Sequence, residues 1–355
     1  MNCIGNSWKD DIMIEVRKIG VLLEKTNLGF ECEGVLNPAV IADDSVVHLL
    51  YRAVGKGNYS TLGYCKLIGP LKVTERSDTP VLFPQHDYEH QGIEDPRIVH
   101  IDNQYFLSYT AYDGVNALGA LANTTDFKHF QKQGIIVPQM TYEEFFHLAE
   151  SKEGMNGKYA RYNEHKGLEE IHGKKLKMWD KNVIFFPRRI KGKLTFLHRV
   201  RPDIQLVMVD QMDDLTPEYW QNYFLHLHAM ILMRAKYDHE VSYIGGGCPP
   251  IETKEGWLLI YHGVHDTVDG YVYSACAALL DLEDPLTEIA RLPYPLFAPE
   301  EPWELHGAVN NVCFPTGTTV FDDTLYIYYG AADEQIAVAS VKLSDLIAEL
   351  LTYSK

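Results

Sequence analysis

The segment 92–97, with the sequence GIEDPR, places two carboxylates and one guanidinium at the entrance of an expected strand. Proline at position 96 disfavours the helical region for the residue before it, so the pattern predicts an extended Asp95 whose carboxylate points in a fixed direction. Because successive strand residues face opposite sides, we do not expect Glu94 and Asp95 to reach the same ligand. A carboxylic acid can protonate a leaving oxygen if burial or a neighbouring anion raises its pKa. An Asp–Arg pair that only holds the turn together explains the residues equally well.

Further polar side chains stand where other strands are expected to end. They combine cations with carboxylates: Arg52, Asp113, Lys181, Arg199, His262, Glu304 and Asp333. Tyrosines accompany them at Tyr51, Tyr109, Tyr112, Tyr261 and Tyr328. A few polar groups on an aromatic wall are typical of a specific small-molecule pocket, and this set suits a polyhydroxylated or anionic ligand. Each residue alone is better explained as structural, and only the recurrence of such residues at strand ends favours a site.

Signatures of several other functions are absent from the sequence. There is no P-loop, no G-x-G-x-x-G and no G-x-S-x-G. The cluster His262-Gly-Val-His265-Asp266 fits no common metal-ligand spacing, so we expect neither a metal nor a cofactor. A net charge of −17 argues against nucleic acid or an anionic membrane as a partner, and no apolar run is long enough to span a bilayer. The remaining expectation is a small-molecule substrate.

The cysteines and the N-terminus predict a cytoplasmic protein. The first residues are charged and lack the apolar region of a secretion signal. The six cysteines are scattered without a C-x-x-C pair, which favours reduced, buried thiols. The sequence leaves open whether the protein is a homo-oligomer.

One pattern recurs five times along the chain and must position these side chains. A proline-bearing segment precedes an apolar strand, a polar turn and a second strand that ends on a polar residue; the prolines are Pro38, Pro96, Pro187, Pro250 and Pro315. Units of about 60 residues that are rich in Val, Ile, Tyr and Phe can each form a four-stranded antiparallel blade. Blades arranged in a ring leave only short, protected edges. The pattern therefore predicts a single all-β domain, residues 1–355, folded as a five-bladed β-propeller. A linear solenoid is the alternative, but polar capping repeats are missing.

Three helices interrupt the strands in this prediction. A charged insertion at 138–180 contains the first, Thr141 to Glu150, and we expect this insertion either to decorate the scaffold or to form a lid. Thr216 followed by Pro217 predicts a second helix that reaches about Ala235. The third is a C-terminal helix at 343–355.

Several sequence blocks resemble glycoside hydrolase family 130: GIEDPRI with YTAYD, KNVIFFPRRIKGKLTFLHR, PPIETKEGWLLIYHGV, AALLDLEDP, and FPTG with YYGAAD. The resemblance extends from about Asn37 to the C-terminal helix. It implies a five-bladed β-propeller that acts on β-mannosides, as an inverting phosphorylase or as a hydrolase. It also implies that Asp95 is the general acid, acting through a sugar hydroxyl in the phosphorylases.

The same resemblance assigns the other site residues. Asn37, Arg52 and Asp333 would bind the mannose in the −1 subsite, and Lys181, Arg199 and His262 would bind phosphate. The predicted substrate-binding set is completed by Glu94, Arg97, Tyr109 and Asp113.

Two departures from the family pattern favour hydrolysis over phosphorolysis. Tyr243 and Tyr273 stand near positions where the phosphorylases typically carry a lysine and an arginine, and fewer cations attract phosphate less strongly. An inverting hydrolase needs a carboxylate that activates water, for which Glu240 is the first candidate and Glu304 the second. The sequence therefore predicts an inverting β-mannosidase, with a β-mannoside phosphorylase that uses inorganic phosphate as the alternative. A non-catalytic sugar-binding propeller is the alternative from another class.

Overall fold

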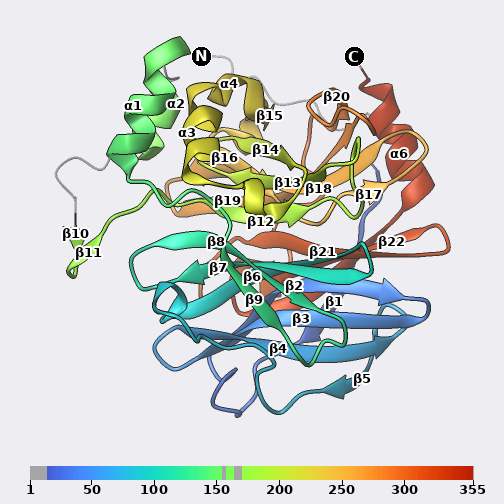
Figure 1. Ribbon diagram of the computed structural model, residues 1–355. Helices are drawn as coiled ribbons and strands as arrows, with labels where there is room; N and C mark the ends of the chain where they lie inside the picture. The colour runs from blue at the N-terminus through green and yellow to red at the C-terminus, as the bar shows by residue number, and fades with distance from the viewer. Residues whose placement is uncertain (1–13, 154–156, 164–169, 355) are drawn as a thin grey trace.

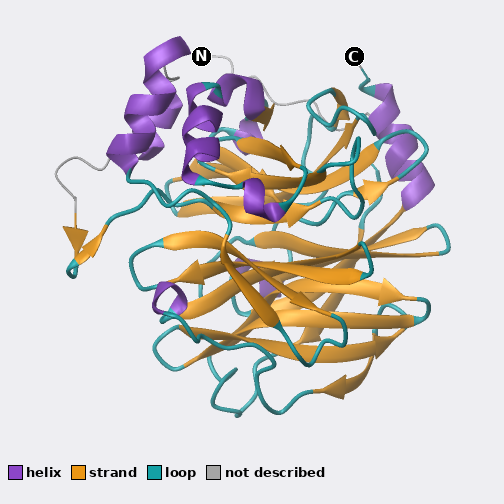
Figure 2. Ribbon diagram, in the orientation of Figure 1, coloured by secondary structure: helices purple, strands orange, loops and turns teal. Residues whose placement is uncertain are grey.

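The computed structural model describes residues 14–153, 157–163 and 170–354. Cys3 and the N-terminal residues considered for a secretion signal lie outside this part of the chain. Of the cysteines described, Cys32, Cys65, Cys248, Cys276 and Cys313 are free thiols, and only Cys32 is not fully buried. The expectation of a mostly β protein is confirmed, since strands dominate the ribbon (Figure 2).

The strands form five consecutive antiparallel units. The first contains β2 (Gly34–Asp43), β3 (Val46–Gly55), β4 (Tyr59–Ile68) and β5 (Lys72–Arg76), and the second contains β6 (Gly92–Ile101), β7 (Gln104–Tyr112), β8 (Ala117–Thr124) and β9 (Gln131–Ile135). A single parallel pair, Ser60 with Gly92, joins these two units into one sheet. Within these two units every later strand pairs with the strand before it, as expected for hairpins connected by short turns.

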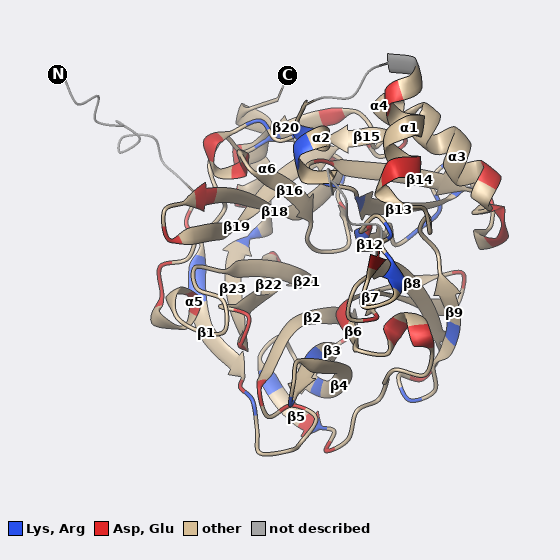
Figure 3. Cartoon of the chain, turned by 90° about the vertical axis from the view of Figure 1, so that its left-hand side faces the viewer, with Lys and Arg blue, Asp and Glu red and all other residues tan. Residues whose placement is uncertain are grey.

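The other three units continue this order. The third contains β12 (Lys181–Phe185), β13 (Leu194–Arg199), β14 (Ile204–Val209) and β15 (Ile231–Met233). The fourth contains β16 (Tyr243–Gly246), β17 (Ile251–Glu252), β18 (Trp257–Thr267), β19 (Gly270–Leu280) and β20 (Glu288–Arg291). The fifth contains β21 (Cys313–Phe321), β22 (Thr324–Ala331), β23 (Gln335–Lys342) and, as its outer strand, β1 (Arg17–Leu23). The N-terminal strand thus completes the C-terminal sheet, and in Figure 3 the units follow one another around the middle of the molecule.

Helices lie outside the sheets. The insertion holds α1 (Tyr142–Glu153), α2 (Gly157–Asn163) and a small hairpin of β10 (Glu170–Ile171) and β11 (Lys174–Lys175), while α3 (Pro217–Leu225), α4 (Leu227–Met230), α5 (Pro302–Leu305) and α6 (Leu343–Thr352) complete the set (Figure 1). The C-terminal helix was therefore predicted correctly. No helix in the described ranges is long and apolar enough to cross a membrane.

The second predicted helix begins as expected but ends early. Thr216 accepts a hydrogen bond from the backbone N–H of Tyr219 at 3.2 Å and Pro217 takes the first helical position. The extension to Ala235 was wrong, because residues 231–233 pair with β14 as the outer strand of the third unit. Strand pairing here outweighs the local preference for helix.

Four of the five units bury the same set of interacting side chains. A tyrosine within the second long strand donates to a buried glutamate, and a cation on the outermost strand pairs with that glutamate. The sets are Tyr51–Glu31–Arg76, Tyr109–Glu89–Lys132, Tyr261–Glu240–Arg291 and Tyr329–Glu304–Lys18. All four glutamates are fully buried, and burial raises the pKa of each tyrosine, which keeps the phenol a hydrogen-bond donor. We call these sets the buried anchors.

The third unit has a variant of the anchor. His198, at the position of the tyrosine on β13, contacts both oxygens of Asp180 through Nδ1 at 2.8–2.9 Å. Its Nε2 lies 2.8 Å from the hydroxyl of Tyr223 on α3. Both His198 and Asp180 are fully buried. Each unit therefore fixes the end of its second strand to a buried acid.

The buried anchors should contribute much more to stability than surface ion pairs do. Glu31→Ala leaves the guanidinium of Arg76 and the hydroxyl of Tyr51 without their partner, which should cost about 3 kcal/mol of unfolding free energy. Lys25→Met breaks the Lys25–Glu334 pair, whose side chains are 47% and 32% exposed, and should cost less than about 1 kcal/mol. Urea unfolding of both variants measures the difference. An equal loss in the two would show that the anchor is not a main source of stability.

Candidate active site

A polar cavity of about 220 Å³ lies where the five units meet. Every unit contributes to its lining: Asn37, Arg52, Glu94, Asp95, Lys181, Asn182, Arg199, Arg201, Tyr243, Tyr273, Val309, Val312, Phe314 and Asp333. Two cavities of about 400 and 200 Å³ share lining residues with it, and Lys181 borders all three. The insertion forms part of the wall through Trp179 and Tyr162. The expectation that polar strand ends come together is therefore met for most, but not all, of the predicted residues.

Three first strands carry the same local distortion at the cavity. Asn37, Asp95 and Asn182 have φ values of 50°, 49° and 55°, and the register of β2, β6 and β12 shifts at these positions. The left-handed region is more accessible to Asn and Asp than to other residues with a Cβ, and a β-bulge redirects the side chains beside it. The prediction of an extended Asp95 was wrong for this reason. The prediction that Glu94 and Asp95 face different ligands was also wrong, because both line the cavity.

Hydrogen bonds hold the carboxylates of this cavity in place. Asn37 Nδ2 donates to Asp95 Oδ1 at 2.7 Å. Arg52 Nη2 donates to Glu94 Oε1 at 2.8 Å, and Arg52 Nη1 lies 3.8 Å from Asp95 Oδ1. Gly330 leaves room for this network, because a Cβ there would lie 2.0 Å from Asn37 Oδ1. The predicted group Asn37, Arg52, Glu94 and Asp95 is thus one connected cluster.

Arg97 supports this cluster from behind. Its Nη1 donates to the backbone carbonyls of Asp95 and Pro96 at 2.9 and 3.0 Å, and its Nε donates to the carbonyl of Gly247. The side chain is almost fully buried and its guanidinium lies over the ring of Phe314. Arg97 therefore positions Asp95 and does not line the cavity, although it was predicted to bind substrate.

The two aspartates of the cavity have pKa values shifted in opposite directions. Burial alone would raise the pKa of Asp95, but the charges of Arg52, Lys181 and Arg97 bring it below its ordinary value. Burial raises the pKa of Asp333 to about 6, and the neighbouring carboxylates add to this effect. Asp333 therefore titrates near neutral pH, whereas Asp95 is ionised in the ligand-free site.

A cluster of cations lies next to Asp95. Lys181, Arg199 and Arg201 line the cavity, and none of them forms an ion pair with a carboxylate in the ranges that the structure describes. Burial, followed by repulsion from Arg201, lowers the pKa of Arg199 to about 10. Its Nε is buried without a hydrogen-bond partner. Unpaired, partly desolvated cations of this kind attract anions.

His262 stands behind this cluster as a neutral side chain. Burial, followed by the charges of Arg199 and Arg97, lowers the pKa of His262 well below its ordinary value. Its Nε2 lies 3.3 Å from Arg199 Nη1, so a neutral imidazole can accept a hydrogen bond there. Gly245 provides the space, because a Cβ would lie 2.5 Å from the imidazole ring. His262 thus orients Arg199 and does not itself line the cavity.

Glu240 and Glu304, the two candidates for a water-activating base, do not line the cavity. Both belong to the buried anchors. Glu304 also accepts backbone hydrogen bonds at 2.8 and 3.0 Å, and Glu240 accepts them at 2.7 and 3.2 Å. Neither carboxylate is exposed to solvent. The structure therefore gives both glutamates a structural role.

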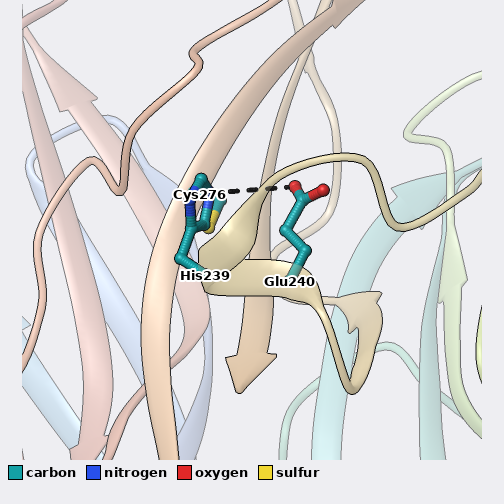
Figure 4. Close-up of side chains that lie close together, drawn as sticks. All are labelled: His239, Glu240 and Cys276. Carbon is teal, nitrogen blue, oxygen red and sulfur yellow. Dashed lines mark ion pairs between the residues drawn. The ribbon is translucent and has the colours of Figure 1, made fainter. Parts of the chain in front are cut away.

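Glu240 also lies in the only cluster of potential metal ligands found among the described residues. Figure 4 shows it beside His239 and Cys276, with the ligand atoms within 4.8 Å of one another. Its oxygens already accept hydrogen bonds from Tyr261, Arg291 and two backbone N–H groups. Burial raises the pKa of the Cys276 thiol well above its ordinary value, which disfavours the thiolate that would bind a metal. The contacts of Glu240 are therefore those of a buried anchor and not those of a metal ligand.

Two further predicted substrate ligands lie away from the cavity. Tyr109 is buried in the second anchor. Asp113 accepts hydrogen bonds from the backbone N–H groups of Val115 and Asn116 at 2.8 and 2.7 Å, and so closes the turn after β7. Most of the expected aromatic wall is likewise internal, and only Tyr112 of those tyrosines borders a connected cavity. The sequence pattern found the strands that carry these residues, but not which face of the strand each residue takes, and Tyr261 and His262 lie inside β18 and not at its end.

The cavity also contains polar residues that the sequence pattern did not single out. Arg201 lies in the turn just after β13, which ends at Arg199, and no strand pattern singles it out. Asn182 follows Lys181 and matches Asn37 and Asp95 in φ and in its place on the first strand. The sequence carried no signal for Asn182, because the residue after it is Val183 and not the proline that follows Asn37 and Asp95.

Known proteins resemble this chain along most of its length. The sequence profile of the family Glyco_hydro_130, described as beta-1,4-mannooligosaccharide phosphorylase, matches residues 25–351. The chain is 34% identical over 348 residues to a 1,2-beta-oligomannan phosphorylase of Thermoanaerobacter sp. strain X514, which covers 94% of this chain and 99% of that relative. It is 31% identical over 329 residues to a beta-1,2-mannobiose phosphorylase of the same strain, covering 88% and 91%.

The fold is also that of a solved relative. The beta-1,2-mannobiose phosphorylase of Listeria innocua, solved in complex with beta-1,2-mannobiose, superposes with a TM-score of 0.70 at 22% identity, covering 96% of this chain and 100% of that structure. The family profile covers most of the sequence, and a relative above 30% identity spans nearly all of it. The chain therefore belongs to glycoside hydrolase family 130.

Proposed function

We propose that this protein is an inverting β-mannoside phosphorylase. Inorganic phosphate, the co-substrate, attacks the anomeric carbon of the terminal mannose from the face opposite the leaving oxygen. The glycosidic C–O bond breaks, the leaving oxygen receives a proton that originates from Asp95, and the product is α-mannose 1-phosphate. The observation that carries this proposal is the cluster of Lys181, Arg199 and Arg201, which lines the cavity next to Asp95 without carboxylate partners among the described residues.

This proposal reverses the order that the sequence suggested. Hydrolysis required a carboxylate that holds a water opposite the acid, and the two glutamates considered for it are held in anchors outside the cavity. The names of the curated relatives also favour phosphorolysis. A non-catalytic sugar-binding protein would have no need for partly buried cations without carboxylate partners beside Asp95.

On the substrate side, Asn37, Arg52 and Asp333 are proposed to bind the mannose whose anomeric carbon reacts. Carboxylates and amides suit sugar hydroxyls, and these three residues line the same cavity. We propose β-1,2-linked manno-oligosaccharides as the first substrates to test, because the relatives that match nearly the full chain carry that linkage in their names.

Phosphate also has an electrostatic effect on Asp95. In the ligand-free site nearby cations stabilise its carboxylate and lower its pKa. A bound dianion offsets the charge of Lys181, so it raises the pKa of Asp95 and favours the protonated form that can supply a proton. The second substrate would thus prepare the acid that the reaction needs.

The overall architecture that we propose is a single five-bladed β-propeller, in which each antiparallel unit is one blade. Pairing of β1 with β23 supports this, because joining the two ends of the chain in one sheet closes a ring. The insertion at 138–180 is proposed to border the substrate entrance, since Trp179 lines two of the connected cavities. A cytoplasmic location stays a prediction.

Cleavage should depend on phosphate. β-1,2-Mannobiose and β-1,4-mannobiose are incubated with the enzyme with and without inorganic phosphate, and products are followed by chromatography and ³¹P NMR. We expect mannose 1-phosphate only when phosphate is present, with the α configuration. Release of two mannose molecules at the same rate without phosphate would contradict the proposal and restore the hydrolase.

Replacing the proposed acid should lower the catalytic rate, whereas replacing an anchor glutamate should lower stability. Asp95→Asn keeps the shape of the side chain but cannot supply the proton, so kcat should fall by about 10²–10⁴-fold. Glu240→Gln should lower thermal stability but leave kcat of the folded enzyme within about threefold. A collapse of kcat in Glu240→Gln with unchanged stability would identify Glu240 as a base after all.

Anion binding should be accompanied by proton uptake. At pH 6.5 Asp333, with a pKa of about 6, is mostly ionised, and an anion that offsets Lys181 raises this pKa and adds protons to the site. Sulfate is a suitable probe because it does not titrate in this range. Calorimetry in two buffers of different ionisation enthalpy should show net uptake that is smaller in Asp333→Asn. Proton release would contradict the electrostatic coupling.

A further inference from the structure

Arg201 occupies an unusual position at the edge of the cation cluster. β13 ends at Arg199, and Arg201 follows in the connection to β14, where it lines the cavity with Arg199 and Lys181. Its guanidinium carbon lies 4.2 Å from the centre of the Tyr243 ring, and its Nη2 donates to the Tyr243 hydroxyl at 3.4 Å. This contact fixes the plane of the guanidinium and leaves most of its N–H groups available to a ligand.

The backbone that carries Arg201 is held rigidly. Gln205 accepts a hydrogen bond from the N–H of Val200 at 2.8 Å and donates to the carbonyls of Val200 and Asp203 at 2.9 and 3.2 Å. The carbonyl of Arg201 itself accepts from Nδ2 of Asn163 on α2 at 2.9 Å. Gln205 is fully buried, and Asn163 is nearly so. Such support is typical of a side chain that must keep one orientation in a functional site.

A pair of phenols completes this edge of the cavity. The hydroxyls of Tyr243 and Tyr273 are hydrogen-bonded to each other. Each phenol has one proton, so one proton lies between the two oxygens and the other remains free to donate. Burial raises the pKa of Tyr273, which keeps both protons in the pair. The two tyrosines therefore offer one hydrogen bond to an oxyanion without adding charge.

We propose that Arg201, presented by the Tyr243–Tyr273 pair, is the residue that makes this cavity select a dianionic oxyanion, inorganic phosphate, over water as the second substrate. This inference rests on the proposed phosphorolysis. Tyr243 and Tyr273 stand near positions where a lysine and an arginine were expected, and Arg201 supplies a positive charge at the same place from the neighbouring unit. Arg201 thereby replaces positive charge that Tyr243 and Tyr273 do not provide. The absence of that charge was the reason to expect hydrolysis.

The selectivity follows from charge. A planar guanidinium can donate two parallel hydrogen bonds to phosphate, and each such charge-assisted bond is worth more than a neutral one. Water is neutral and gains little from a third cation, whereas a dianion gains with every positive charge in a cavity of low dielectric constant. Arg201 therefore affects binding of the second substrate and not of the mannoside, whose proposed ligands are Asn37, Arg52 and Asp333.

Steady-state kinetics of Arg201→Gln test this inference. Rates are measured against phosphate at saturating mannoside and against mannoside at saturating phosphate. We expect the KM for phosphate to rise about 10–100-fold and the KM for the mannoside to stay within about twofold. Arg188→Gln is a matched control, because Arg188 also stacks on a ring, that of Trp257, but lies outside the cavity, so its phosphate KM should not change.

The outcomes separate this inference from the proposed function. If the parent enzyme cleaves mannosides without phosphate, the proposed function falls and the inference with it. If the parent depends on phosphate but Arg201→Gln keeps the parent KM for phosphate, only the inference is overturned. If Arg201→Gln does not fold, Arg201→Lys decides: a rise of about 3–10-fold in the phosphate KM alone supports the role, and an unchanged value refutes it.

Discussion

A buried acid in each unit determines where the side chains of the cavity lie. In four units a tyrosine within the second long strand donates to a glutamate that is also paired with a lysine or arginine, and in the third unit His198 and Asp180 take these places. Because adjacent strand residues face opposite sides, the residue after an anchored one points out of the interior of its unit, and Arg52 and Arg199 reach the cavity in this way. Arg52 follows Tyr51, Arg199 follows His198 and His262 follows Tyr261. The anchor thus fixes one residue inside the unit and thereby aims the next.

The electrostatics of the site follow from this geometry. The charges within each anchor balance, since each buried glutamate is paired with one cation on the outer strand. The charges aimed at the centre are not balanced in the same way. Arg52 pairs with Glu94, whereas Lys181, Arg199 and Arg201 have no carboxylate partner in the described part of the chain. Arg199 is buried and the other two are partly buried, and positive charge taken from water without a partner is costly to a folded protein, so a ligand of opposite charge relieves that cost.

Much of this architecture could be predicted from the sequence, because period and strand pattern are local properties. The prolines and the alternating apolar runs identified the five units and the approximate strand ends. The bulges at Asn37, Asp95 and Asn182 could not be predicted, since each left-handed residue is imposed by the surrounding sheet, and at Asn37 and Asp95 it also contradicts the usual preference before proline. The directions of the Tyr109 and Asp113 side chains could not be predicted for a similar reason.

The structural role of the glutamates is recognised only when the repeated units are compared. Considered alone, Glu240 and Glu304 were reasonable bases. Their equivalents Glu31 and Glu89 show the repeat: each glutamate precedes its tyrosine by 20, 20, 21 or 25 residues. That spacing was present in the sequence, but only the contacts reveal that it has a structural meaning. Irregular features, such as Arg201 beside Tyr243, are the better indicators of function in a repeated scaffold.

A crystal structure of the enzyme with phosphate and a manno-oligosaccharide would test the central claim most directly, namely that the strand ends build an anion site beside Asp95. The account predicts phosphate in contact with Lys181, Arg199 and Arg201, on the face of the sugar opposite the scissile oxygen. Glu240 and Glu304 should keep their hydrogen bonds to Tyr261 and Tyr329. Phosphate bound elsewhere, or a water held by a carboxylate at that position, would contradict it.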